Sequence, residues 1–567
     1  MNAPPPGLPR PGDARSAAPG RRPRPGPRGR TAGEADLAAV AAAVAGLPPR
    51  RDLLIEHLHA LQDRHGCLRA GHLVALSGLL RLAPVEVFEV ASFYHHFDIL
   101  EDAAPAPLTL RVCESLPCAL AGAGGLLEEL RAATPEGVRV VPAPCMGACH
   151  RAPACALGHE LVEHATPERI AAALADGAPP LADPPGLDSY FARGGYAVLR
   201  AVREGGEAAR EAMPAAVEVA NLRGLGGAGF PAFRKWRLVA AQPGPRHLVV
   251  NADEGEPGTF KDRHCLEAEP HRFLEGMLLA AHAVGADACW IYLRDEYPHL
   301  RRLLAREIAA LEAAGLAGVP IHLRRGAGAY ICGEETALLE SLEGRRGYPR
   351  QKPPLPGEAG LFGRPTLIHN VETLWFLPEI LGHPEGAARF AAAGRRGRLG
   401  QRLFSVSGRV REPGVKLAPA GVTARELVEE FSGGMAEGHR FAAYLPGGAS
   451  GGILPESLAD LPLDFGALDA EGCFVGSAAV VVLSDRDDLP EAVRNLVRFF
   501  RDESCGQCTP CRVGTAKAAR LLEAPRWDRD LLEELALAMA DGSICGLGQA
   551  AMNPVRALLR HFPEAAP

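Results

Sequence analysis

The sequence lacks a long apolar run, an internal repeat and an export signal. No uninterrupted apolar stretch reaches the roughly 18 residues that a membrane-spanning helix needs, so we predict no such helix. No motif recurs at the period of a solenoid, which excludes a repeat architecture. Arg21-Arg22 is followed by more Pro and Arg instead of an apolar segment, so a twin-arginine export signal is not expected.

Acidic residues outnumber basic ones after Arg30. The formal net charge is −7, although residues 1–30 hold seven Arg against one acidic residue. The rest of the chain is therefore acidic, which argues against a nucleic-acid partner. The Pro-rich start works against the amphipathic helix of a transit peptide, and we expect a disordered tail over residues 1–34.

The 14 cysteines are clustered, and no secretory signal precedes them. A disulfide framework is therefore improbable, and metal binding is the better expectation. Six cysteines are isolated and are expected to be buried free thiols. These six are Cys67, Cys155, Cys265, Cys289, Cys332 and Cys473.

Hydrophobic periodicity divides the 567 residues into several domains. Residues 35–104 have a helical pattern, broken at Ala83-Pro84. Residues 105–180 have the order strand, helix, strand of a small α/β domain, with strands "LTLRVC" and "VRVVPAPC" ending at cysteines. A larger α/β region, a β-rich region and a helical region are expected in turn at 190–400, 401–485 and 486–560.

Four cysteines of the small α/β domain form two close pairs. Cys113 and Cys118 have C-x4-C spacing, and Cys145 and Cys149 have C-x3-C spacing. Loops after adjacent parallel strands lie side by side, so the pairs can present four thiolates to one centre. An iron–sulfur cluster and a zinc ion both accept four cysteines, and a redox pair or plain reduced thiols are the alternatives.

The C-terminal region holds the triplet Cys505, Cys508 and Cys511, in "SCGQCTPCRVG". Cys545 is the only cysteine downstream, and its Gly neighbours allow close backbone approach. A C-x2-C-x2-C triplet with a distant fourth cysteine is typical of a [4Fe–4S] cluster, whereas zinc sites use paired cysteines.

Three Gly-rich or acidic loops indicate a cofactor pocket. "RGLGGAGFP" is a weak nucleotide signal and equally fits a plain turn. "NADEGEPGTFKDR" follows a strand and places acidic residues where α/β folds bind ligands, although a solvated loop is the alternative. "GAGAYICGEET" puts Glu334-Glu335 at a helix start, which also suits the helix dipole. Beside two clusters these loops favour a flavoprotein, because flavin converts a hydride into single electrons.

The motifs resemble those of respiratory complex I. From Gly194 to the C-terminus the chain resembles the FMN- and NADH-binding subunit, and residues 51–177 resemble the neighbouring thioredoxin-like [2Fe–2S] subunit. The same fusion is found in diaphorase subunits of NAD-reducing hydrogenases and of NAD-dependent molybdenum or tungsten formate dehydrogenases, and the second group is the more similar. The resemblance implies a multidomain α/β chain: a thioredoxin-like domain with a helical lead-in, a Rossmann-like FMN domain, a ubiquitin-like β-grasp domain and a C-terminal helical bundle.

The resemblance also implies roles for individual residues. The expected FMN-binding residues are Gly224, Gly226, Gly227, Ala228, Gly229, Lys235, Asn251, Asp253, Glu254, Tyr330, Gly333, Glu334, Glu335, Asn370 and Thr373. Those expected at NAD(H) are Phe230, Glu256 and Lys352. Cys113, Cys118, Cys145 and Cys149 would hold the [2Fe–2S] cluster, and Cys505, Cys508, Cys511 and Cys545 the [4Fe–4S] cluster. No residue is expected to act as an acid or base, since hydride passes between stacked rings.

Three positions depart from the family pattern. Leu225 stands where complex I commonly has Arg, Leu355 replaces a Phe that stacks on the adenine, and His369 replaces an Asn. The stretch between Cys511 and Cys545 is also somewhat short for the family.

The expected function is that of a cytoplasmic diaphorase subunit. Its cofactors would be FMN, NAD(H), [4Fe–4S] and [2Fe–2S], and its partner a large catalytic subunit that oxidises formate. A nickel–iron hydrogenase partner and a complex I module are the alternatives within this class. A flavin-less electron carrier or a zinc-stabilised scaffold is the alternative from another class.

Overall fold

The computed structural model describes residues 30–101, 104–177 and 184–567, so most of the expected tail (1–34) lies outside the described residues. The helical lead-in comprises α1 (Glu34–Ala43), α2 (Leu54–His65), α3 (Ala70–Leu80) and α4 (Pro84–Ala91). The predicted break at Ala83-Pro84 is confirmed, because Pro84 begins α4. Two residues each of β1 (Leu68–Arg69) and β2 (Ile99–Leu100) pair in parallel and close this unit.

The small α/β domain has a four-stranded sheet in the order β4-β3-β5-β6. β3 (Leu108–Cys113) and β4 (Val138–Ala143) are parallel and joined by α6 (Ala123–Ala133), as the sequence pattern predicts. β5 (Cys155–Leu157) and β6 (Glu160–Val162) add antiparallel strands, and α7 (Pro167–Asp176) follows. β4 ends at Ala143, so Cys145 lies in the following loop and not in the strand that the sequence pattern predicts.

The central domain has a parallel sheet in the order β10-β7-β8-β9, the expected Rossmann-like arrangement. Its strands are β7 (His247–Ala252), β8 (Ala288–Leu293), β9 (Ile321–Arg325) and β10 (Thr366–Asn370). The main helices around it are α10 (Gly206–Val219), α11 (Ala232–Ala240), α13 (Pro270–Val284) and α14 (Pro298–Ala313). β8 is buried along its whole length, which explains its continuous apolar run "ACWIYL".

The β-rich region forms a five-stranded mixed sheet in the order β12-β11-β15-β13-β14. Its strands are β11 (Gln401–Gly408), β12 (Gly414–Pro419), β13 (Phe441–Leu445), β14 (Leu454–Pro455) and β15 (Ala479–Ser484). β11 and β15 are parallel neighbours, as a β-grasp sheet requires, and the other pairs are antiparallel. The C-terminal helices are α21 (Leu489–Asp502), α22 (Thr509–Leu522), α23 (Arg529–Gly542), α24 (Gly546–Ala550) and α25 (Asn553–His561).

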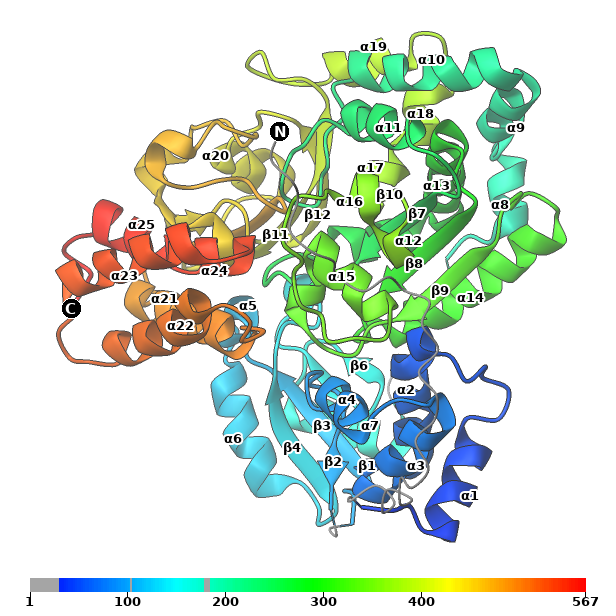
Figure 1. The fold of residues 1–567 in the computed structure, drawn as a ribbon. Helices are drawn as coiled ribbons and strands as arrows, with labels where there is room; N and C mark the ends of the chain where they lie inside the picture. Colours follow the sequence, from blue (N-terminus) through cyan, green and yellow to red (C-terminus); the bar gives the residue numbers. More distant parts are fainter. Residues whose placement is uncertain (1–29, 102–103, 178–183) are drawn as a thin grey trace, which may run out of the picture.

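Figure 1 shows the central domain between the N-terminal units on one side and the β-grasp sheet with the C-terminal helices on another. Polar contacts fix the lead-in to the end of β9: Arg324 pairs with Glu56, and Arg325 pairs with Asp63 at 2.7 Å. His59 Nε2 lies 2.8 Å from the Gly326 carbonyl oxygen. Among the described residues, no helix has the length and apolar character needed to cross a membrane.

Candidate functional site

Two asparagines mark the carboxyl edge of the parallel sheet. Asn251 of β7 and Asn370 of β10 are register partners in adjacent strands. The Asn251 amide donates to the Gly333 carbonyl at 2.8 Å and its oxygen accepts from the Asp253 N–H, so it holds two neighbouring loops. Ligands of open α/β sheets bind beyond this edge.

The Gly-rich loop between α10 and α11 folds back on itself. The Gly224 N–H donates to the Phe230 carbonyl at 2.8 Å, and the Gly229 N–H donates to the Gly224 carbonyl at 3.2 Å. Gly227 and Gly229 have φ of 136° and 65°, which other residues rarely adopt. A Cβ at Gly226 would come within 3.1 Å of Asn370, so the bare backbone lies directly over the sheet edge.

A cavity of about 600 Å³ lies between this loop and the sheet edge. Most of the residues predicted for FMN line it: Gly226, Gly227, Ala228, Asn251, Asp253, Glu254, Tyr330, Gly333, Glu334 and Asn370. The other predicted FMN residues lie outside its wall. Gly224 and Gly229 close the loop, and Thr373 accepts a hydrogen bond from the Leu225 N–H at 2.9 Å. Leu225, which stands where the family commonly has Arg, is buried and belongs to the apolar core.

Asp253 supplies a test of whether the cavity fits a flavin. Its Oδ2 atom is buried and has no hydrogen-bond partner among the described residues. Burial raises the pKa of this carboxyl well above its usual range. An unpartnered buried oxygen is costly unless a ligand supplies a donor, and the ring N–H of a flavin is such a donor. The Asp253 carboxyl therefore offers an acceptor of the kind that the ring of FMN requires.

Glu254 has a structural task that its motif did not reveal. Its carboxylate accepts the N–H groups of Asp262 and Arg263, at 2.8 and 3.1 Å, and the Tyr297 hydroxyl at 2.9 Å. It thereby caps the start of α12 (Lys261–Ala268). Burial raises the pKa of Glu254 to about 8.

Lys261 forms a buried ionic cluster in the cavity wall that sequence reasoning missed. Its ammonium lies 2.8 Å from Asp262 and 2.9 Å from Glu372. Burial alone would lower the pKa of Lys261, but these two carboxylates outweigh burial and raise it. Lys261 therefore stays charged, and its Nζ also donates to the Asn370 amide oxygen at 3.3 Å.

The cavity wall is completed by distant parts of the chain. Glu256 accepts from the Tyr330 hydroxyl and, at 2.8 Å, from the Ser450 N–H of the β-grasp region. Lining residues that sequence reasoning did not assign are Gly255, Thr259, Lys261, Asp262, Ile331, Ser450, Phe474, Gly476, Ser477, Gly546, Leu547, Gln549, Ala550 and Asn553. Those at 255–262, 331 and 546–549 lie inside stretches already singled out, whereas the others belong to no local motif.

A second cavity of about 260 Å³ adjoins the first through Ala228. Three large apolar side chains, Phe230, Leu238 and Leu355, line it and are 47%, 36% and 45% exposed. Exposed apolar groups gathered around one cavity indicate a binding site for an apolar or aromatic group. Phe230 and Leu355 were singled out from the sequence, whereas Leu238 was missed.

Charged residues surround the mouth of the second cavity. Lys235 and Glu335 line it, with their charged groups 3.4 Å apart, and not the larger cavity. Lys352 pairs with Glu334 at 3.0 Å and with Glu335 at 2.8 Å, so it lies near both cavities. His369, where the family has Asn, accepts a hydrogen bond from the Trp236 indole N–H at 2.8 Å, which keeps an acceptor at that position.

The four cysteines of the thioredoxin-like domain come together in its interior. All four are at most 4% exposed. The sulfurs of Cys145 and Cys149 are 3.4 Å apart. The thiols of Cys118 and Cys145, together with burial, raise the pKa of Cys113, so the two pairs are direct neighbours.

The central domain covers this N-terminal cysteine site. Arg294 is buried and donates to the Cys145 carbonyl at 2.6 Å and to the Glu254 carbonyl. Arg263 donates to the Gly147 carbonyl at 3.3 Å, and Phe260 stacks on the ring of His150 at 4.4 Å. The loop that carries Cys145 and Cys149 therefore packs against the same segment that forms the acidic wall of the large cavity.

The C-terminal cysteines lie at the ends of helices. Cys508 caps α22, Cys511 lies in its first turn, and Cys545 caps α24. Burial raises the pKa of Cys511 to about 12, and the three other thiols add to the shift, so the four are assembled at one place. Cys505 and Cys508 are only half-buried. A Cβ at Gly548 would come within 2.8 Å of the Cys511 Cβ, so this glycine permits the close packing of α24 on α22.

The remaining six cysteines are buried free thiols, as expected. In residues 30–101, 104–177 and 184–567, no group of three or more His, Cys, Asp or Glu side chains is arranged to hold a single metal ion. The cofactors of the two regions that hold these cysteines therefore follow from the family matches.

Comparison with protein families matches most of the chain. Residues 40–178 match the thioredoxin-like [2Fe–2S] ferredoxin model. Residues 217–379 match the Nuo51 FMN-binding domain, and residues 491–566 match the NADH-ubiquinone oxidoreductase-F iron–sulfur binding region.

Individual relatives extend these matches. The chain is 44% identical over 392 residues to an F-type NADH-quinone oxidoreductase subunit (F 2) of Rhizobium meliloti, covering 66% of this chain and 92% of the relative. It is 40% identical to the F subunit of Aquifex aeolicus, covering 67% of this chain and 90% of that relative. A chain of an NAD+-reducing [NiFe]-hydrogenase in the H2-reduced state superposes with a TM-score of 0.80 at 35% identity, covering 91% of this chain and 93% of that one.

These matches define the class of the protein: it is an NADH-dependent flavin and iron–sulfur oxidoreductase subunit, with FMN, [2Fe–2S] and [4Fe–4S] as cofactors. Within that class, the chain belongs to the family of the F subunit of NADH-quinone oxidoreductase. It differs from the curated relatives in length, since they match about two thirds of it, whereas the hydrogenase chain matches nearly all of it.

Proposed function

We propose that the chain is the diaphorase subunit of a cytoplasmic enzyme that reduces NAD+ with electrons from formate, oxidised in a partner subunit. We call the cavity of about 600 Å³ the flavin-type cavity and the cavity of about 260 Å³ the nucleotide-type cavity. The observation that supports the diaphorase role is that the two cavities meet at Ala228. Bound FMN would supply conversion between the hydride of NAD(H) and the single electrons of the clusters. The residues of this chain position the two ring systems and exclude water from between them.

The large cavity would hold FMN by its polar wall. Asp253 would accept from the flavin ring, and Asn251 and Asn370 would hold the end of the cofactor at the sheet edge. Lys261 would fix the Asn370 side chain at the ribityl and phosphate end, since its Nζ lies 3.3 Å from the Asn370 amide oxygen. Glu256 would face the nicotinamide nucleotide from its position between Tyr330 and Ser450.

The smaller cavity would hold the adenine end of NAD(H). Phe230, Leu238 and Leu355 offer apolar surface to a flat ring, and Lys352 offers a cation to the phosphates. Leu gives contact area but no aromatic stacking, so we expect weaker nucleotide binding than an aromatic pair would give.

Replacing Leu355 with Phe tests this placement. Stacking is worth on the order of 1 kcal/mol, so Leu355→Phe should lower the KM for NADH about fivefold with kcat unchanged. Leu537→Phe, an exposed position on α23, is the matched control and should leave KM unchanged. An unchanged KM in Leu355→Phe would place the adenine elsewhere without touching the diaphorase role.

The formate proposal rests on sequence resemblance, namely the fusion, the overall length and the stretch "CESLPCALAGA". Hydrogen is the second candidate donor. The structural match to a chain of an NAD+-reducing [NiFe]-hydrogenase, which covers 91% of this chain, favours it. In both cases the proposed partner is a large catalytic subunit, and the domain limits and ligand residues expected from the sequence are part of the proposal.

Purification of the complex from its own cells separates the two donors. The large subunit is identified by mass spectrometry, and NAD+ reduction is measured anaerobically with formate and then with hydrogen. Formate-dependent reduction with a molybdenum- or tungsten-containing partner supports the proposal. Hydrogen-dependent reduction with a nickel–iron partner supports the second candidate. Activity with neither donor contradicts both.

A further inference from the structure

Two serine hydroxyls lie against sulfur atoms of the two cysteine sites. Ser115 Oγ is 3.2 Å from Cys113 Sγ in the N-terminal site, and Ser504 Oγ is 3.3 Å from Cys511 Sγ in the C-terminal site. Between a free thiol and a hydroxyl, either atom can donate the hydrogen bond. A cysteine that binds a metal centre is a thiolate, and its sulfur has no proton to give. In the loaded protein each serine hydroxyl is therefore the donor.

Ser115 is oriented toward the sulfur and not toward the helix that follows it. It is the N-cap residue of α5 (Leu116–Leu120), where a serine oxygen usually accepts a hydrogen bond from the backbone of the first turn. The Ser115 side chain makes no such bond, although the residue is only 6% exposed. A buried hydroxyl without a partner is costly, so the contact with Cys113 is what satisfies it.

A third hydroxyl, that of Ser543, is buried beside the C-terminal cysteines and has no hydrogen-bond partner among the described residues. Ser543 follows the end of α23 and precedes Cys545 by two residues. A Cβ at Gly548 would come within 2.5 Å of Ser543 Oγ and 2.8 Å of the Cys511 Cβ, so both side chains pack against the same bare glycine. A buried hydroxyl that lacks a partner next to four cysteines is placed to donate to a sulfur of a cluster held there.

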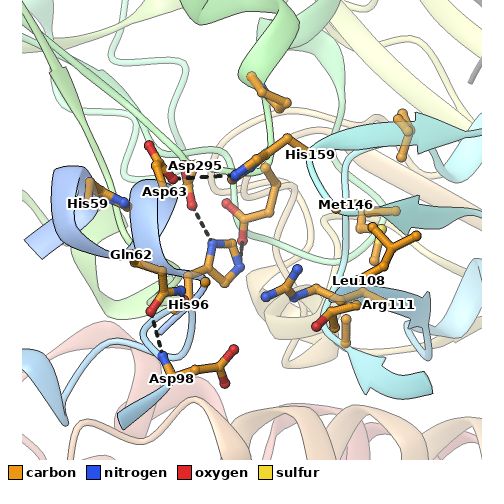
Figure 2. Close-up of a pocket in the computed structure, with 18 of the residues that line it drawn as sticks. His59, Gln62, Asp63, His96, Asp98, Leu108, Arg111, Met146, His159 and Asp295 are labelled. Atoms are coloured by element: carbon orange, nitrogen blue, oxygen red, sulfur yellow. Dashed lines mark hydrogen bonds and ion pairs between the residues drawn. The ribbon is translucent and has the colours of Figure 1, made fainter. Parts of the chain in front are cut away.

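Full charges beside the N-terminal site largely cancel one another. Figure 2 shows the cavity of about 220 Å³ where the helical lead-in, the thioredoxin-like domain and the central domain meet, with Met146, next to Cys145, in its wall. Among the described residues at this junction, four carboxylates face four arginines: Asp63, Asp98, Asp295 and Glu296, against Arg111, Arg139, Arg294 and Arg325. Neighbouring charges of opposite sign add little net potential at a distance. Hydrogen bonds to the sulfurs are thus a local influence that a substitution can isolate.

We propose that these serine hydroxyls raise the reduction potentials of the two clusters: Ser115 that of the [2Fe–2S] cluster, and Ser504 and Ser543 that of the [4Fe–4S] cluster. The proposal rests on the cysteine ligands assigned under the proposed function. One-electron reduction adds negative charge to a cluster and its sulfurs, and no bond forms or breaks. A hydroxyl donor stabilises this added charge, so it favours the reduced state. Each cluster therefore accepts an electron more readily than it would without its serine.

The test measures the midpoint potentials of both clusters in the anaerobic full-length holoprotein, reduced stepwise with dithionite and followed by electron paramagnetic resonance. Ser115→Ala should lower the midpoint potential of the [2Fe–2S] signal alone. Ser504→Ala and Ser543→Ala should each lower that of the [4Fe–4S] signal alone. We expect the ratio of reduced to oxidised cluster at a fixed potential to fall about tenfold, which is about 59 mV for one electron. The second cluster of each variant is its internal control.

Further variants separate the hydroxyl from a loss of packing. Ser504→Thr keeps the hydroxyl and should retain the wild-type potential. Ser432→Ala removes a buried hydroxyl of the β-grasp region that also lacks a partner among the described residues, and it should shift neither signal. Ser504 is only half-buried, so its variants retain the test if Ser115→Ala or Ser543→Ala does not load its cluster.

Unchanged potentials in all three alanine variants would overturn the proposal, as would equal shifts of both signals in any one of them. Cys118→Ser and Cys508→Ser examine the ligand assignment separately, because each should abolish or alter one signal and leave the other. If the cysteine variants left both signals as in wild type, the ligand assignment would fail and the serine proposal with it. Altered signals in the cysteine variants with unshifted potentials in the alanine variants would overturn the serine proposal alone.

Discussion

The two four-cysteine sites differ most in their access to solvent. The N-terminal site is closed on all four thiols, and Arg294 ties its loop to the wall of the flavin-type cavity. The C-terminal site leaves Cys505 and Cys508 half-buried at helix ends. The contrast shows how one chain can separate two tasks. Under the proposed function, a cluster at the surface would exchange electrons with a partner, whereas a cluster in the interior would communicate first with the flavin.

Replacing one cysteine in each site should give the largest difference between the two sites in electron transfer. Cys508→Ser should abolish electron transfer to the partner, on the order of 100-fold or more, because it removes the exit cluster. Cys118→Ser removes the interior cluster and should cost less than about tenfold. Partner-linked NAD+ reduction is the measurement, and bleaching of FMN by NADH should survive in both variants as the control for folding. Equal losses would mean that both clusters lie on the path.

Replacing Arg294 should give the second largest effect, because of the two cysteine sites this residue contacts the buried one. Arg294→Gln leaves Glu296 buried without its cation, which costs about 3–5 kcal/mol. The denaturant midpoint for loss of the [2Fe–2S] signal should fall, while the [4Fe–4S] signal is spared. Arg440→Gln removes an exposed pair with Asp485 and should cost below about 1 kcal/mol. If both signals fell together, the two sites would unfold as one unit.

Acid should loosen the attachment of the N-terminal units through His59. Burial lowers the pKa of His59 from 6.5 to about 4. Protonation of His59 does not affect the free energy of unfolding above pH 6.5. Between pH 6.5 and 4 the free energy of unfolding falls, because the unfolded chain binds a proton at this histidine and the folded chain does not. The loss amounts to about 3 kcal/mol at pH 4.

The check is the stability of the [2Fe–2S] signal to denaturant at pH 7 and at pH 4.5. His59→Gln keeps a donor for the Gly326 carbonyl and should flatten the pH dependence. His383→Gln, at an exposed position, should leave it as in wild type. A pH dependence unchanged by His59→Gln would remove His59 from the account.

Of these tests, iron chelation should give the smallest difference between the two cysteine sites. Bathophenanthroline under reducing conditions should take iron from the half-exposed site about tenfold faster than from the closed one. Stopped samples analysed for the two cluster signals give the rates. Faster loss from the N-terminal site would reverse the comparison.

The two cysteine sites could be predicted from the sequence because their cysteines follow short, recognisable spacings. The triplet and the paired spacings name their own residues, and Cys545 followed as the only downstream cysteine. Asn251 was also within reach, since it follows a predicted strand of an α/β region, where ligands bind at the strand ends. Asn370 came only from the family resemblance. These features depend on short stretches of chain.

The rest depends on packing that no short stretch records. Ser450 and Asn553 reach the flavin-type cavity only because the β-grasp sheet and α25 dock there. Glu254 lines the cavity as the resemblance implies, and the fold adds that its carboxylate caps α12, since the strand end brings it to three donors.

The most direct test is anaerobic purification of this chain, with counts of flavin, iron and zinc and a visible spectrum before and after NADH. The account predicts one FMN, about six iron atoms from one [2Fe–2S] and one [4Fe–4S] cluster, and bleaching by NADH. Zinc without flavin, or a flavin-loaded sample whose spectrum NADH does not change, would contradict it.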